Sequence, residues 1–140
     1  MSHCGTIIIQ YCATRYLNLE KLLPSYKLGV TRSCLRAIRR LQKTGHLPSN
    51  PGLFKDYSAY GQFIDVRLTA LECLVDFVNV EGSWADLTHL IDMIETDPVP
   101  YIRHKLIRLI VEKPPFERAS RGMHPNDKIE LVERLWGIMK

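Results

Sequence analysis

The sequence lacks the features that mark a membrane-spanning or a secreted protein. No apolar run approaches the roughly 20 residues that a helix needs to cross a bilayer. The apolar segment at residues 5–13 has no positively charged stretch before it, so it does not read as a signal peptide. No C-x-x-C spacing occurs among the cysteines, which are Cys4, Cys12, Cys34 and Cys73. We therefore expect a reducing compartment, without zinc or disulfide chemistry.

Motifs for catalysis are missing as well. The chain contains no H-E-x-x-H pair and no glycine-rich phosphate loop. Four histidines fall in different predicted elements, with no glutamate at ligand spacing: His46, His89, His104 and His124. A metallopeptidase needs at least three ligands and a general base. The sequence therefore predicts no enzyme, no catalytic residue, no metal, no cofactor and no small-molecule substrate.

The composition is that of one globular domain with unevenly distributed charge. A hydrophobic content of 46% and a charged content of 24% are ordinary, and 140 residues suffice for one core. Residues 1–60 carry nine Lys/Arg against two acidic residues, a net charge of +7. Residues 61–140 carry ten against thirteen, a net charge of −3. An anionic partner is therefore expected to prefer the N-terminal part.

Hydrophobic periodicity predicts helices along most of the chain and no strand. The expected helices cover residues 16–23, 31–43, about 51–60, 66–79, 84–97, 100–113 and 126–139. Expected helix caps are Thr31, Ser49–Asn50, Ser83 and Asn126. Residues 1–14 show no clear period and stay unassigned. The predicted fold class is all-α.

A basic stripe runs along the helix expected over residues 31–43. It comprises Arg32, Arg36, Arg39, Arg40 and Lys43, opposite an apolar stripe on the same helix. The five side chains lie within about 100° of one another around the axis. They are candidates for binding DNA phosphates or a partner protein. A solvated helix face is the alternative, because base-reading residues and interleaved aromatics are missing.

The stretch from residue 97 to residue 116 predicts a corner between two helices. Pro98 disfavours a helical conformation at Asp97, and Pro100 suits the first turn of the next helix. Arg103 is expected on the apolar side of that helix, where a lone charge would be expensive. We therefore expect Asp97 and Arg103 to form a structural ion pair that fixes the helix angle. A binding role for Arg103 is the alternative.

Three other helix faces are predicted from the same periodicity. The inner face of the third helix is expected to contain Leu53, Phe54, Tyr57 and Tyr60. The solvated strip of residues 66–79 is expected to contain Thr69, Glu72 and Asp76. The last helix gathers Ile129, Val132, Leu135, Trp136 and Met139 on one side. Because no helix follows it, we expect a fragment of a longer array or a covering surface, with an end cap as the alternative.

Arginines recur at a regular interval. Arg32, Arg67 and Arg103 are 35 and 36 residues apart, and apolar residues mostly follow each at the same offsets. A period in this range, filled by a pair of helices, is typical of an α-solenoid. The sequence predicts about three HEAT/armadillo-like helical hairpins over residues 15–140, plus a final unpaired helix.

The corner at Asp97 and Arg103 resembles the HEAT/armadillo repeat, whose acidic corner residue and second-helix arginine are associated with a stabilising ladder. Gly61 and Tyr26 stand at the equivalent acidic positions, so only the third repeat matches fully.

A more specific resemblance covers about residues 15–140. These residues resemble the C-terminal helical region of the TFIID subunit 2 family of TBP-associated factors, a family with an aminopeptidase-like fold. The segments that carry the resemblance are Arg15–Tyr26, Ser33–Arg39, Asp65–Glu72, Asp97–Lys105 and Pro114–Phe116.

The resemblance implies a non-catalytic, nuclear scaffold within the general transcription factor TFIID. Such a module would support core-promoter recognition and preinitiation complex assembly for RNA polymerase II. The implied partners are other TBP-associated factors and initiator DNA, with no membrane. Two alternatives stay open: a generic HEAT-repeat adaptor in another complex, and direct promoter contact through the basic helix face.

Overall fold

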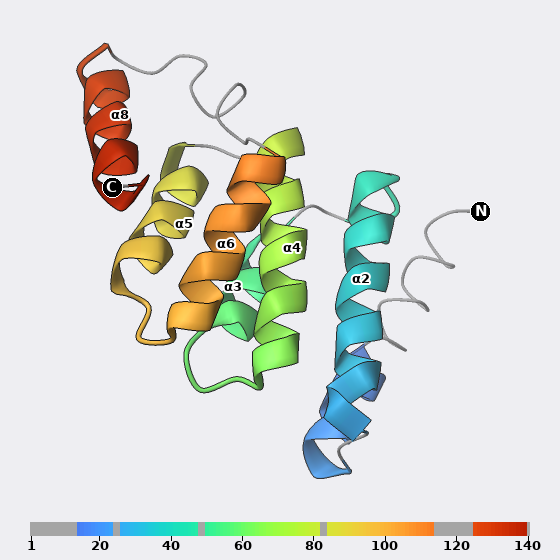
Figure 1. Cartoon of the computed structure of the whole chain (residues 1–140). Helices are drawn as coiled ribbons and strands as arrows, with labels where there is room; N and C mark the ends of the chain where they lie inside the picture. The colour runs from blue at the N-terminus through green and yellow to red at the C-terminus, as the bar shows by residue number, and fades with distance from the viewer. Residues whose placement is uncertain (1–13, 24–25, 48–49, 82–83, 114–124, 140) are drawn as a thin grey trace. The chain divides into compact units, whose positions relative to one another are not determined.

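The computed structural model describes residues 14–23, 26–47, 50–81, 84–113 and 125–139. Within these ranges every regular element is helical and none is a strand. The elements are a helix over residues 14–22, η1 (Tyr26–Leu28), α2 (Gly29–Lys43), α3 (Gly52–Ser58), α4 (Ile64–Val80), α5 (Trp84–Thr96), α6 (Pro100–Glu112) and α8 (Pro125–Met139) (Figure 1). None of these helices combines the length and apolar character needed to span a bilayer. The predicted helices are confirmed, with ends that shift by a few residues.

The chain divides into two compact units, Met1–Leu74 and Val75–Lys140. The core of the first unit contains Leu35 of α2, Phe54 of α3 and Leu71 of α4, each 0% exposed. Burial of one such side chain contributes roughly 1.5–3 kcal/mol. The thiol of Cys73 on α4 lies 3.8 Å from the carbonyl oxygen of Leu35, so α2 and α4 are in direct contact.

The start of α2 differs from the prediction. The helix begins at Gly29, and the residue at its N-cap is Leu28, with φ 50 and ψ 43. Lys27 before it also has a positive φ, of 49. Thr31, expected as the cap, lies within the first turn and is buried. A left-handed backbone costs a non-glycine residue roughly 1–2 kcal/mol, so the packing of the unit holds a turn that sequence preferences do not favour.

The corner between α3 and α4 depends on a glycine and a buried arginine. Gly61 has φ 104, a conformation that residues with a side chain rarely adopt. Arg67 of α4 is 2% exposed, and its Nε donates a hydrogen bond of 2.9 Å to the carbonyl of Ser58 at the end of α3. At the other end of α3, the residue at the N-cap is Pro51 and not Asn50, so the predicted cap is wrong by one position. Asn50 Oδ1 still accepts a 2.9 Å hydrogen bond from the N–H of Gly52, the first residue of the helix.

Two predictions about exposure in this unit are wrong. Tyr60, expected on the inner face of the third helix, is 73% exposed because α3 ends at Ser58. Thr69, expected on the solvated strip of the fourth helix, is 2% exposed. Its hydroxyl donates to the carbonyl of Asp65 at 3.0 Å, which satisfies its polar atom inside the unit. The predicted caps Ser49 and Ser83 lie outside the described residues.

The second unit contains a helical hairpin, with α5 and α6 side by side (Figure 1). Its buried apolar side chains include Leu87, Leu90, Ile91, Ile94, Ile102, Leu106 and Ile110. Pro100 lies in the first turn of α6, as predicted. Asp97 is 8% exposed, and its Oδ1 accepts a 2.9 Å bond from the N–H of Val99. The corner therefore forms where the two prolines place it.

The last helix, α8, contacts α5. Among the described side chains of this helix, Leu131 is apolar and buried, at 5% exposure. Ile129, Val132 and Trp136, predicted to share one side, are 58%, 64% and 69% exposed. Asn126 lies in the first turn and not at the N-cap, because the helix begins at Pro125.

Candidate functional site

Three of the five predicted basic residues lie on one exposed face of α2. Arg36, Arg40 and Lys43 are exposed, whereas Arg32 is only partly exposed. The three exposed residues follow one another at intervals of four and three positions. Residues at this spacing share one side of a helix, so they form a row of positive charge along α2.

Arg39 is a correction to the predicted stripe. It is 4% exposed, and its Nη1 lies 3.4 Å from Gln42 Oε1, one turn further along the helix. On a helix of about 100° per residue, Arg39 stands at the edge of the basic arc that is nearest to Leu35. Leu35 is 0% exposed, so the packing that buries it takes Arg39 inside as well. The sequence shows the arc but not where the buried side begins.

A surface groove of about 640 Å³ lies along the exposed face of α2. Its described lining residues are Ser33, Arg36, Ala37, Arg40 and Leu41. All five belong to α2, and around its axis Arg36 and Arg40 lie on one side of Ser33, whereas Ala37 and Leu41 lie on the other. The face therefore combines a basic edge (Arg36, Arg40 and Lys43) with an apolar strip (Ala37 and Leu41).

A cavity of about 650 Å³ lies elsewhere in the first unit, lined by both polar and apolar residues. Glu20 contributes to its wall and is 4% exposed. Burial, and then the negative charge of Glu20, raise the pKa of the Cys34 thiol. Burial, followed by the charges of Cys34 and Asp56, raises the pKa of the Tyr57 hydroxyl, which also lines the cavity. A thiol with a raised pKa is a poor nucleophile, so Cys34 has the properties of a structural residue.

The predicted corner pair is only partly as expected. Asp97 is buried at the corner, but Arg103 is exposed, so its predicted position on the buried side of α6 is wrong. Ile102 and Leu106 define the buried side, and Arg103 follows Ile102 by about 100° around the axis. Arg103 instead lines a groove of about 580 Å³ together with Arg134 of α8. The ion pair between Asp97 and Arg103 stays a prediction.

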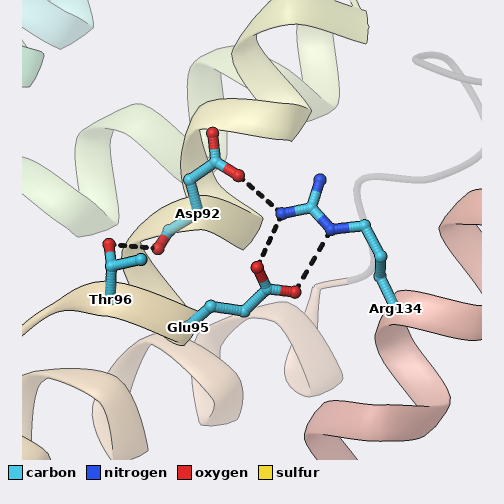
Figure 2. A network of polar contacts seen from close by, with 4 residues as sticks. All are labelled: Asp92, Glu95, Thr96 and Arg134. Carbon is cyan, nitrogen blue, oxygen red and sulfur yellow. Dashed lines mark hydrogen bonds and ion pairs between the residues drawn. The ribbon is translucent and has the colours of Figure 1, made fainter.

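Arg134 ties α8 to α5, a contact that the sequence analysis did not find. Its Nη2 lies 2.5 Å from Asp92 Oδ1 and 2.9 Å from Glu95 Oε2, and its Nε donates to Glu95 Oε1 at 3.2 Å (Figure 2). Glu95 thus accepts both arms of the guanidinium fork, a strongly directional arrangement. Hydrogen bonds to Glu95 and then to Asp92 raise the pKa of Arg134. The sequence signal was the spacing of Asp92 and Glu95, which puts both carboxylates on one helix face.

The described residues contain no group of three His, Cys, Asp or Glu side chains that could hold a metal ion. His46 and His104 are exposed, and His89 is partly buried on α5. Cys34 and Cys73, the cysteines in the described ranges, are not joined in a disulfide. Cys4, Cys12 and His124 lie outside the described residues. The absence of catalytic activity stays a prediction.

Comparison with known proteins gives matches over most of the sequence. Residues 5–140 match a family model described as TAF2-like, TPR repeats. The chain is 55% identical over 123 residues to transcription initiation factor TFIID subunit 2 of Drosophila melanogaster, covering 88% of this chain and 10% of that protein. Proteins of the same name from Gallus gallus and Caenorhabditis elegans are 51% and 28% identical, over 126 and 130 residues. These matches cover 90% and 89% of this chain but 11% and 12% of the relatives.

The chain thus spans about a tenth of the length of the curated relatives that it matches. The family resemblance stated from residues 15–140 is confirmed, and the family model begins earlier, at residue 5. The family description names TPR repeats, whereas the corner resembled a HEAT/armadillo repeat. Both are arrays of helix pairs, so the predicted class, an all-α α-solenoid, is confirmed. From its helices and from a family model that covers nearly its whole length, the chain belongs to the TAF2-like family of TPR repeats.

Proposed function

We propose that this chain is a non-catalytic interaction module of TFIID. It acts in the nucleus, where it supports core-promoter recognition and assembly of the preinitiation complex for RNA polymerase II. The observation that carries this proposal is the 55% identity, over 88% of the chain, to a protein named transcription initiation factor TFIID subunit 2. Its partners are other TFIID subunits.

Two exposed surfaces support an interaction role. One is the face of α2 with its basic edge and apolar strip. The other is the side of α8 that exposes Ile129, Val132 and Trp136. Large apolar and aromatic side chains grouped on a surface are typical of protein interfaces. Helical repeats offer such surfaces without any reaction centre.

The proposal is tested by affinity purification. The tagged 140-residue chain, shown to be folded by circular dichroism, is incubated with nuclear extract, and the bound proteins are identified by mass spectrometry. TBP-associated factors are expected among them. The control is a Leu106→Asp variant, which places a charge in the core and is expected to unfold the chain. Proteins that this variant still recovers bind in a way that does not depend on folding. Recovery of subunits of a different assembly would favour a generic helical-repeat adaptor, and recovery of no TBP-associated factor would refute the proposal.

Direct contact with promoter DNA is a second candidate function, supported by the exposed row of Arg36, Arg40 and Lys43. With three phosphate contacts, the slope of log K against log[salt] is expected near about −2.7. Five contacts, as the full predicted stripe would make, correspond to a slope of about −4.5. A slope near zero, or no binding at low salt, would remove this candidate.

A further inference from the structure

We propose that the exposed face of α2 binds an acidic amphipathic helix of a partner protein. The inference rests on the proposed function as an interaction module, and it names the chemistry of one partner. Its basis is that a basic edge and an apolar strip border the same groove of about 640 Å³. A ligand that fits this groove presents carboxylates on one side and apolar side chains on the other.

The spacing of the basic edge matches the repeat of a helix. Arg36, Arg40 and Lys43 are exposed and span about 10 Å along α2, at a rise of 1.5 Å per residue. Carboxylates four and three positions apart on a partner helix repeat over the same distance. Guanidinium groups bind carboxylates through directional, charge-assisted hydrogen bonds. An acidic helix lying along α2 can therefore meet the three cations at once.

The apolar strip gives the partner helix a second contact. Ala37 is exposed and Leu41 is partly exposed, four positions apart, beside Arg36 and Arg40. The small side chain of Ala37 lets the backbone of a partner approach closely, and Leu41 offers apolar surface one turn away. An amphipathic helix can pack its apolar side against this strip while its acidic flank meets the basic edge.

The apolar strip also distinguishes this partner from DNA. A phosphate backbone would use the three cations but would gain nothing from Ala37 and Leu41. Arg39, which would have added a fourth or fifth phosphate contact, is 4% exposed. The net charge of +7 over residues 1–60 attracts any anion. The groove itself selects an anion that carries apolar surface, so an acidic protein helix is favoured.

The test uses the 140-residue chain and a synthetic probe. The probe is a fluorescein-labelled 20-residue helix with leucines at heptad spacing and glutamates along one flank, titrated by fluorescence anisotropy. We expect saturable 1:1 binding. The double variant Arg36→Glu/Arg40→Glu is expected to weaken binding at least tenfold, and Ala37→Glu similarly, because it places a charge in the apolar strip. These side chains are exposed, so thermal melting by circular dichroism is expected to stay within a few degrees of the parent.

The matched control is Arg103→Glu/Lys128→Glu, which changes the net charge equally at exposed positions outside α2. It is expected to alter probe affinity no more than about twofold. A shuffled peptide of the same composition that binds equally well would overturn the proposal, since charge alone would then explain binding. The proposal would also be overturned if a 20-base-pair DNA duplex bound the α2 face and the probe did not. If the parent chain does not bind the probe but still recovers TFIID subunits from nuclear extract, this inference alone is overturned. Probe binding without that recovery would overturn only the proposed function.

Discussion

Arg67 is 2% exposed, and its Nε donates to the carbonyl of Ser58 at 2.9 Å. It occupies the same repeat position as Arg32, which is partly exposed, and Arg103, which is exposed. At the corner before Arg67 stands Gly61, where the repeat pattern would place an acidic residue. A backbone carbonyl therefore accepts the hydrogen bond at this corner. The arginine at this repeat position is therefore buried in one repeat and exposed in another.

We predict that Arg67→Met destabilises the chain by about 1–3 kcal/mol, because the buried carbonyl of Ser58 loses its donor. Arg103→Met is the matched control at the equivalent position. It is expected to cost less than about 1 kcal/mol, because the side chain of Arg103 is exposed and substitutions at exposed positions usually change stability little. Urea denaturation of both variants gives the free energies of unfolding. If both substitutions lower the free energy of unfolding equally, the hydrogen bond from Arg67 to Ser58 does not stabilise the corner as proposed.

The raised pKa values of Cys34 and Tyr57 predict that the folded chain becomes less stable as pH rises in the alkaline range. The pKa of each group is raised in the folded chain above its ordinary value, 9.0 for the thiol and 10.0 for the phenol. Above about pH 9 the unfolded chain therefore loses these protons first, which favours unfolding. The free energy of unfolding is expected to fall as pH rises from 8 through 11. A Cys34→Ser/Tyr57→Phe variant should show a smaller decrease, and an identical pH profile would refute the link.

At the scale of elements, two glycines give opposite predictions. Gly61 has φ 104, and no atom lies within 4 Å of the position that an added Cβ would take, so Gly61→Ala would suffer from backbone strain alone. We expect it to cost about 1–2 kcal/mol. Gly137 lies within α8, also with open space around it. Gly137→Ala is expected to stabilise by up to about 1 kcal/mol, because alanine has the higher helix propensity. Thermal melting compares the two, and a stabilising Gly61→Ala would contradict the corner geometry.

The contact between α8 and α5 depends on Arg134. Its fork joins Asp92 and Glu95, whose side chains are 56% and 36% exposed, so the attachment should weaken with salt. We predict that Arg134→Gln speeds amide hydrogen exchange in α8 severalfold and leaves α6 nearly unchanged. The control is Arg108→Gln, which removes an exposed pair with Glu112 within α6. Equal exchange in α8 for both variants would show that other contacts hold the helix.

At the scale of the whole molecule, stability is expected to be local. Repeat proteins are stabilised by terms within repeats and between neighbours. Leu106 is 0% exposed in the second unit, so Leu106→Ala should cost about 2–5 kcal/mol through the cavity that it leaves. Hydrogen exchange should rise most in residues 84–112 and least in residues 29–43. A uniform rise along the chain would instead indicate one cooperative unit.

Local patterns predicted the elements well. Pro100 and the apolar spacing of Ile102, Leu106 and Ile110 predicted α6, and the structure places that helix at Pro100–Glu112. Proline geometry and the 3.6-residue period act within a few residues, so they can be read without knowing the fold. The turn before α2 could not be predicted, because Leu28 adopts a positive φ that its side chain does not favour.

The sequence by itself determined the helical class, the repeat period and the family, because these depend on short-range spacing and on residue identity. Tertiary structure decided which polar residues are buried. Arg39 and Arg67 are inside while Arg103 is outside, although periodicity placed Arg39 on an exposed stripe and Arg103 on an apolar side. The difference arises because neighbouring helices set how far each helix is rotated about its axis. A rotation of a few tens of degrees moves a side chain between solvent and core.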